Sequence, residues 1–213
     1  EIFSVCGTNT TLGFSHGFLK NYLTSIGEDF PKTLNVVMMA PKGMGPTVRS
    51  SYLKGNGINC SVAVDKSRCG VGTEHALSWA VAVGSPTIYG TTFKNELKSD
   101  LVGERGILLA GLYGIIEYLF RYLDYNRENI RRQHYLTVYD VLTKKIPDKI
   151  KQDGILSLYE DFSPSFKTIF ENNYEKSYYL SKHLINEIYD EVESGNELNS
   201  IITNSEREMM DLN

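Results

Sequence analysis

The chain is poor in cysteine, in net charge and in long apolar runs, and each shortage excludes a class of protein. Three cysteines among 213 residues are few, odd in number and without metal-ligand spacing, so we expect reduced thiols in a protein that is not secreted. A net charge of −4 offers no basic field to a nucleic acid. No apolar run reaches the roughly 20 residues of a membrane span, and the first residues lack the pattern of a signal peptide. The sequence therefore predicts a soluble protein without nucleic-acid or membrane partners.

What is present is the composition of an ordinary globular protein. Apolar residues make up 41% of the chain and charged residues 23%, which is close to the average for soluble domains. A chain of this length can bury a sizeable core, either as one large domain or as two small ones.

The first third of the chain alternates between strand and helix patterns. Residues 12–18 are typical of a strand that runs into a turn, and residues 18–26 have apolar positions at helical spacing. Residues 34–40 form a short apolar run between prolines, which is the pattern of a buried parallel strand. Residues 60–64 predict another strand. This order favours a parallel α/β sheet, in which ligands bind beyond the carboxyl ends of the strands.

From Gly72 onward the pattern is helical. We expect helices over residues 73–83, 93–122 and 127–151, the last broken at Pro147, and a final long helical region that begins near 163 and ends at Gly195. The predicted fold is thus α/β followed by all-α. Residues 1–70 would form a domain with a parallel sheet, and residues 71–213 a helical domain.

Two carboxylates four residues apart are the first candidate site. Asp100 and Glu104 would lie one above the other on the same helix face, and a hard divalent ion such as Mg²⁺ would relieve their repulsion. The alternative is a solvated first helical turn, where acids are favoured by the helix dipole. Residues 107–116 are apolar nearly all round, so we expect this helix to be buried.

Two turns at predicted strand ends carry the other candidates. His16 follows the first strand, although a single histidine in a turn is more often structural. Lys42 follows the next strand and could neutralise a substrate oxygen, or could be an ordinary surface lysine. Gly43 and Gly45 would allow the backbone to approach a ligand closely.

Three motifs resemble one family, both in their residues and in their order along the chain. Residues 98–108 read KSDLVGERGIL, residues 15–18 read SHGF, and residues 41–46 read PKGMGP. All three resemble ketol-acid reductoisomerase in its long, plant-type form, and the resemblance extends from about residue 12 to about residue 201.

The resemblance implies a function and a ligand set. The family converts 2-acetolactate or 2-aceto-2-hydroxybutyrate to 2,3-dihydroxy acids in branched-chain amino-acid synthesis, with Mg²⁺ and NADPH. It implies that Asp100 and Glu104 bind the metal, that His16 lies beside the nicotinamide and the metal, and that Lys42 contacts the substrate. Pro41 and Gly43 would join His16 in binding the cofactor.

The resemblance also implies the surroundings of the enzyme. Residues 1–70 would be the end of an NADP-binding Rossmann-like domain, and the helical domain would be 6-phosphogluconate-dehydrogenase-like. The compartment would be a plastid, with the cytoplasm as the alternative. The apolar stretch at residues 107–116 needs contact all round, which separately predicts a homodimer or larger.

Parts of the family pattern are absent from these residues. No Gly-x-Gly-x-x-Gly fingerprint for a pyrophosphate occurs in the chain, so the 213 residues resemble the middle of the family sequence, and the isolated chain could be inactive. Two alternatives stay open. One is another NADP-dependent hydroxyacid dehydrogenase, which would not need the carboxylate pair. The other is a non-catalytic assembly or binding fragment of the same fold.

Overall fold

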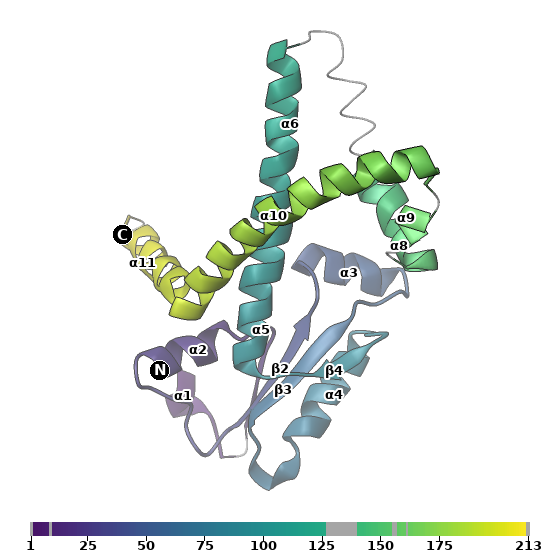
Figure 1. The fold of residues 1–213 in the computed structure, drawn as a ribbon. Helices are drawn as coiled ribbons and strands as arrows, with labels where there is room; N and C mark the ends of the chain where they lie inside the picture. The colour runs from purple at the N-terminus through teal and green to yellow at the C-terminus, as the bar shows by residue number, and fades with distance from the viewer. Residues whose placement is uncertain (1, 9, 127–139, 155–156, 161, 212–213) are drawn as a thin grey trace. The chain divides into compact units, whose positions relative to one another are not determined.

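A computed structural model describes residues 2–8, 10–126, 140–154, 157–160 and 162–211 (Figure 1). The chain divides into two compact units. The first contains residues 1–103 and 192–213, and the second contains residues 104–191. The boundary that the sequence predicts after residue 70 stays a prediction.

The first unit is built on a four-stranded sheet in the order β1-β2-β3-β4. Its strands are β1 (Thr11–Phe14), β2 (Asn35–Pro41), β3 (Cys60–Lys66) and β4 (Ile88–Gly90). Strands β1 and β2 are parallel, as are β3 and β4, whereas β2 and β3 are antiparallel. The sheet is therefore mixed, whereas the sequence pattern predicted a wholly parallel sheet.

The antiparallel pair has a local cause. The chain leaves β2 at Pro41 and enters β3 at Cys60, and these two residues are paired across the ladder. The backbone N–H of Lys42 also donates to the carbonyl of Asn59 at 2.8 Å. The intervening helix α3 (Gly45–Leu53) therefore brings the chain back to the end of the sheet at which β2 stops. It does not carry the chain across to the opposite end, as the crossover to a parallel strand would.

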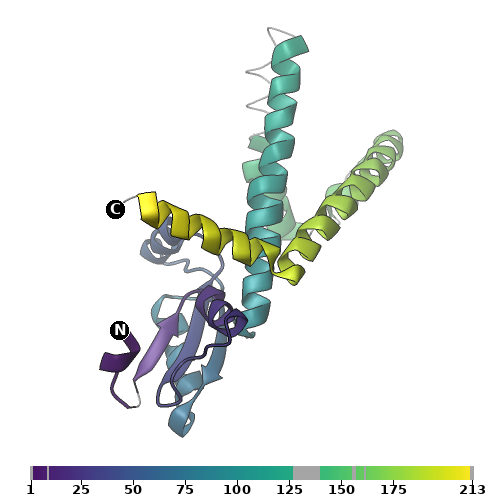
Figure 2. The same cartoon turned by 90° about the vertical axis from the view of Figure 1, so that its left-hand side faces the viewer.

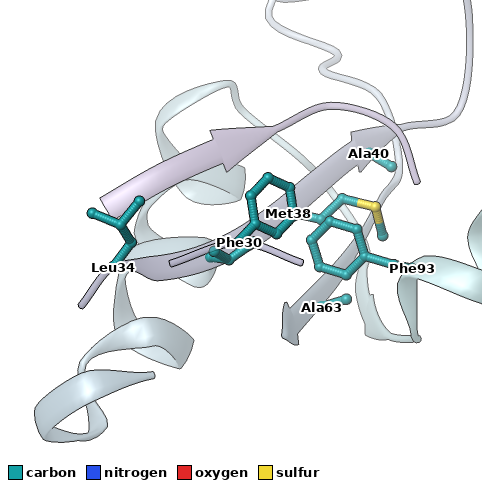
Figure 3. Packing of buried hydrophobic residues seen from close by; sticks show 7 residues of the cluster. Phe30, Leu34, Met38, Ala40, Ala63 and Phe93 are labelled. Atoms are coloured by element: carbon teal, nitrogen blue, oxygen red, sulfur yellow. The ribbon is translucent and has the colours of Figure 1, made fainter. Parts of the chain in front are cut away.

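Strand β2 is the centre of the core because both of its faces are covered. Its alternate residues Val36, Met38 and Ala40 pack in one cluster with Phe30 and Phe93 (Figure 3). Met39, on the other face, packs with Cys60 and with residues of α4 (Gly72–Ala82). Side chains of successive strand residues point to opposite faces, so an apolar run along β2 stabilises both layers.

The remaining elements among the first 99 residues are short helices around this sheet. They are α1 (Ile2–Val5), α2 (Phe18–Ser25), a 3₁₀ turn η1 (Arg68–Gly70) and α5 (Phe93–Ser99). Thr92 caps α5, because its hydroxyl accepts the backbone N–H of Asn95 at 3.1 Å. The sequence pattern predicted α2 and α4 correctly but did not indicate β4.

The helical conformation continues without a break after α5. A π-helical segment, η2 (Asp100–Gly111), leads into α6 (Leu112–Asn126). π-Helices are rare, and their usual form, a single-turn bulge inside an α-helix, is frequent at functional sites. The prediction that residues 107–116 are buried was wrong for this chain: Tyr113 and Ile115 are 66% and 62% exposed. An apolar sequence on all sides of a helix indicates that its side chains are stabilised by burial, but it does not show whether the same chain or another one buries them.

All the elements described in the later chain are helices. It contains η3 (Val141–Lys145), α8 (Ile146–Asp153), α9 (Ser157–Glu160), α10 (Pro164–Ser194) and α11 (Asn196–Asp211). Gly195 follows α10, as predicted, and α11 begins directly after it (Figure 2). Pro147 lies in the first turn of α8, directly after the π-helical η3, so the type of helix changes beside this proline but the helical conformation does not end there. Part of the helix expected over residues 127–151 lies outside the described residues.

Candidate functional site

Two loops meet the start of α5 at one edge of the sheet. Strand β1 ends at Phe14 and the turn that follows carries His16 and Gly17; strand β2 ends at Pro41 and is followed by Lys42. Because β1 and β2 are parallel, their carboxyl ends lie at the same edge, where open α/β sheets bind ligands. The sequence motifs at residues 15–18 and 41–46 are therefore neighbours in the fold.

Gly17 fixes how closely the first loop approaches α5. A Cβ atom at this position would lie 2.1 Å from the carbonyl oxygen of Phe93, so only glycine fits. The Gly17 N–H donates to Glu96 Oε2 at 2.7 Å. The side chain of Asn21 donates to the carbonyls of Gly17 and Phe93 at 2.7 and 3.1 Å. The turn is thus joined to the first turn of α5 directly, by the bond from Gly17 to Glu96, and indirectly through Asn21 of α2.

Glu96 is the buried charge of the site. Its residue is 3% exposed, and a buried carboxylate needs partners. It has two: the Gly17 N–H at Oε2 and the Lys42 ammonium, whose Nζ lies 3.5 Å from Oε1. Glu96 therefore links the two strand-end loops through one helix position.

His16 and Asp100 form the exposed side of the same group. His16 Nε2 lies 2.8 Å from Asp100 Oδ2, and their side chains are 26% and 17% exposed. One ligand atom each from His16, Glu96 and Asp100 lies within 4.8 Å of the others. Two carboxylates and an imidazole at this spacing are donors that suit a divalent cation.

The structure brings together three of the residues that the sequence singled out: His16, Lys42 and Asp100. Sequence reasoning missed Glu96, although it lies four residues before Asp100, a spacing that places both on one helix face. Glu104, the predicted partner of Asp100, belongs to the second compact unit, and its role in metal binding stays a prediction.

The two remaining predicted positions lie on the second loop. Pro41 ends β2. Gly43 has φ +156°, a backbone conformation that other residues rarely adopt, so the backbone alone explains the glycine. Their role in binding a cofactor is not decided by these contacts and remains a prediction.

The fold and this group define a class of protein: an α/β unit of the dinucleotide-binding type, joined to helices, with acidic and basic side chains at the strand ends. Comparison with protein families makes the assignment specific. Residues 1–88 match the acetohydroxy acid isomeroreductase NADPH-binding domain, and residues 93–213 match the ketol-acid reductoisomerase C-terminal domain. The chain belongs to the ketol-acid reductoisomerase family.

Individual relatives agree with the family assignment. The chloroplastic ketol-acid reductoisomerases of Spinacia oleracea and Pisum sativum are 41% and 42% identical over 95% of the chain. A structure of an NADH-preferring ketol-acid reductoisomerase from an uncultured archean covers 99% of this chain and 63% of its own, with a TM-score of 0.81 and 27% identity. The chain spans 35% and 36% of the length of the two plant relatives.

Proposed function

We propose that the protein containing this chain is a ketol-acid reductoisomerase of branched-chain amino-acid synthesis. Its substrates would be 2-acetolactate and 2-aceto-2-hydroxybutyrate, and its products the corresponding 2,3-dihydroxy acids. The observation that carries the proposal is the meeting of His16, Glu96 and Asp100, with Lys42 beside them, at the carboxyl ends of β1 and β2.

The donor set fits magnesium. Asp100, with Glu104 four residues later, would hold Mg²⁺ through carboxylate oxygens, which are the ligands this ion prefers. Bound magnesium would act as a Lewis acid on the carbonyl and hydroxyl oxygens of the substrate. Glu96 is already paired with Lys42, and we assign it to holding that lysine in place.

The basic residue of the site has a role of its own. The Lys42 side chain is 30% exposed and its ammonium is held 3.5 Å from Glu96 Oε1. A positive charge fixed at the end of β2 can bind an anionic oxygen of a hydroxy-keto acid and orient it. NADPH would bind along the same edge, with His16, Pro41 and Gly43 bordering the nicotinamide.

The metal assignment can be tested by thermal unfolding. We expect Mg²⁺ to raise the melting temperature of the wild-type chain and Asp100→Asn to abolish that rise. Glu117→Gln is the matched control, because Glu117 forms a surface pair with Arg121 outside the site. A Mg²⁺ response that survives in Asp100→Asn would contradict the assignment.

The activity requires a separate test with the complete gene. We expect it to restore growth of a bacterial strain that lacks its own reductoisomerase on medium without branched-chain amino acids, and the Asp100→Asn gene to fail. Growth supported equally by both genes would overturn the proposed role of Asp100. No growth with the wild-type gene, at confirmed expression of soluble protein, would overturn the proposed activity.

We further infer that the protein assembles as a homodimer or larger through its helical part. Helix α6 exposes Tyr113, Ile115 and Tyr118, each by more than 60%. Large exposed apolar side chains gathered on one element are typical of interfaces, most often of symmetric dimers. Light scattering at micromolar concentration should give at least twice the monomer mass. A monomer mass independent of concentration would contradict this inference.

The names of two relatives support a proposal for the compartment. No helix among the described residues is long and apolar enough to cross a membrane, and the two plant relatives are named as chloroplastic. We propose a plastid location, which imaging of a fluorescent fusion to the complete protein would test: diffuse cytoplasmic signal would contradict it.

A further inference from the structure

We propose that His16 is held in one tautomer by its own turn and donates a hydrogen bond to Asp100, so that it is a positioning residue and not a metal ligand. This proposal rests on the function proposed above, because it concerns how the chain prepares Asp100 for a divalent ion. Its evidence is the pattern of donors and acceptors around the imidazole ring.

The ring nitrogen Nδ1 is an acceptor. The backbone N–H of Phe18 donates to it at 3.1 Å, and a nitrogen that accepts a hydrogen bond carries a lone pair and no hydrogen. In neutral imidazole the hydrogen is then on Nε2. Nε2 lies 2.8 Å from Asp100 Oδ2, so the N–H meets a carboxylate oxygen, and donor and acceptor are matched at both nitrogens.

Metal binding by this ring would break that match. An ion at Nε2 needs the lone pair of that nitrogen, so the hydrogen would move to Nδ1. Two N–H groups, those of Nδ1 and Phe18, would then face each other across 3.1 Å. Although His16, Glu96 and Asp100 are close enough to share an ion, the hydrogen-bond pattern favours Asp100 as the ligand and the imidazole as its support.

The turn is placed on α5 in a way that fixes this contact. It touches Phe93, Glu96 and Asp100, which follow one another at spacings of three and four residues and therefore lie on one helix face. The close approach of Gly17 to Phe93 sets the distance between the backbones. The bond from the Gly17 N–H to Glu96 sets the register. With the distance and the register fixed, the His16 side chain lies opposite Asp100 and can bond to it.

The consequence for Asp100 is orientation. A hydrogen bond to one carboxylate oxygen restricts rotation of the group, and so fixes the direction in which its lone pairs can meet an ion. Losing such a supporting partner typically lowers metal affinity about 10- to 100-fold. The same contact keeps the imidazole itself in place beside the site.

Nitrogen-15 NMR of histidine-labelled wild-type chain tests the tautomer directly. The chain has four histidines, and the signals of His16 are those that disappear in His16→Gln. We expect long-range couplings of the form with hydrogen on Nε2, both without metal and with saturating Mg²⁺. A form with hydrogen on Nδ1, or a switch to it when Mg²⁺ is added, would overturn the proposal.

Two substitutions test the positioning role by Mg²⁺ titration calorimetry. The longer amide in His16→Gln can place an N–H donor near the position of Nε2, whereas the shorter amide in His16→Asn can replace only Nδ1. We expect Mg²⁺ affinity to stay within about threefold of wild type in the first and to fall about 10- to 100-fold in the second. Equal losses in both variants, at unchanged melting temperatures without metal, would overturn it.

Failure of the metal assignment would look different. If Asp100→Asn and Glu104→Gln bind Mg²⁺ as well as wild type does, the proposed metal site fails. The tautomer measured without metal is independent of that result, and hydrogen on Nδ1 in the metal-free chain would contradict this inference whichever residues bind the ion.

Discussion

The sheet around β2 and the long helix α10 bury their apolar residues to very different degrees. Residues 35–40 of β2 are each at most 3% exposed, and the layers on both faces of the strand come from the same unit. Helix α10 has 31 residues and none of them is buried. Tyr179 and Leu180 in α10 are 62% and 75% exposed.

The difference separates two uses of apolar sequence. In the sheet, apolar residues form a core that the local chain closes, and the candidate site lies at its edge. In α10 a run of aromatic rings stacks along the helix, with Phe170 and Tyr174 at 5.9 Å and Tyr174 and Tyr178 at 6.1 Å between centroids, while each tyrosine stays more than half exposed. Substitutions in the sheet should therefore change the free energy of unfolding of the first unit. Substitutions in α10 should change it only where another surface packs against that helix.

The strongest test of this comparison replaces one apolar residue in each region. Met38→Ala in β2 removes a fully buried side chain and should lower the free energy of unfolding by about 2–5 kcal/mol. Leu180→Ala in α10 should change it by no more than about 0.5 kcal/mol. Urea unfolding followed by fluorescence of Trp79, the single tryptophan, reports on the sheet, because this residue packs in the β2–α4 cluster.

The comparison fails if Leu180→Ala costs as much as Met38→Ala. A cost that grows with protein concentration would instead show that α10 is covered by a second copy.

A smaller effect is expected from exchanging glycines. Gly17→Ala would bring Cβ to 2.1 Å from the Phe93 carbonyl oxygen. The backbone would have to shift to avoid this clash, and such overpacking typically lowers the free energy of unfolding by about 1–3 kcal/mol. In α6, a Cβ at Gly114 would meet nothing within 4 Å, so Gly114→Ala should stabilise its helix by up to about 1 kcal/mol. Circular dichroism during thermal unfolding of the two variants measures both.

Opposite outcomes for the two glycines would support a tight contact at the site and an open helix surface. If Gly17→Ala unfolds like wild type and keeps its Mg²⁺ response, the turn does not position His16 in the way we describe.

Sequence patterns predicted the parts of this fold that depend on local order. The apolar run of β2, the helices α2 and α4 and the end of α10 at Gly195 are properties of consecutive residues. The antiparallel direction of β3 could not be predicted, because it depends on where the chain after α3 meets Pro41. The exposure of Ile115 could not be predicted either, because burial depends on surfaces distant in the sequence.

The same division applies to the site. His16, Lys42 and Asp100 lie in recognisable motifs, so the sequence singled them out, and the structure brings them close together. Glu96 was missed because no motif contains it; its importance comes from burial and from the Gly17 N–H. Glu96 and Asp100 are visibly four residues apart in the sequence, but pairs of acids at this spacing also occur on many solvent-exposed helices.

The smallest expected effect concerns a charged cluster beside the core. Asp29 accepts hydrogen bonds from Lys20 at 2.6 Å and from Lys66 at 2.7 Å, and these bonds hold the pKa of Asp29 well below its ordinary value of 3.8. Lys20 also pairs with Asp65 at 3.0 Å. Burial alone would lower the pKa of Lys20, but the bonds to Asp29 and Asp65 raise it above the usual value. The cluster thus joins α2 to the end of β3.

Because the pKa of Asp29 is depressed in the folded state, its contribution is present above the unfolded value near 3.8 and is lost as the pH falls below it. Asp29 is half exposed, so Asp29→Asn should cost at most about 1 kcal/mol at pH 7, and its difference from wild type should shrink below pH 4. Asp140→Asn, in the helical part, removes a pair with Lys144 and should leave the Trp79 transition unchanged. Unfolding in urea at several pH values checks both variants. A difference between Asp29→Asn and wild type that persists undiminished in acid would mean that the charge of Asp29 is not what ties α2 to the sheet.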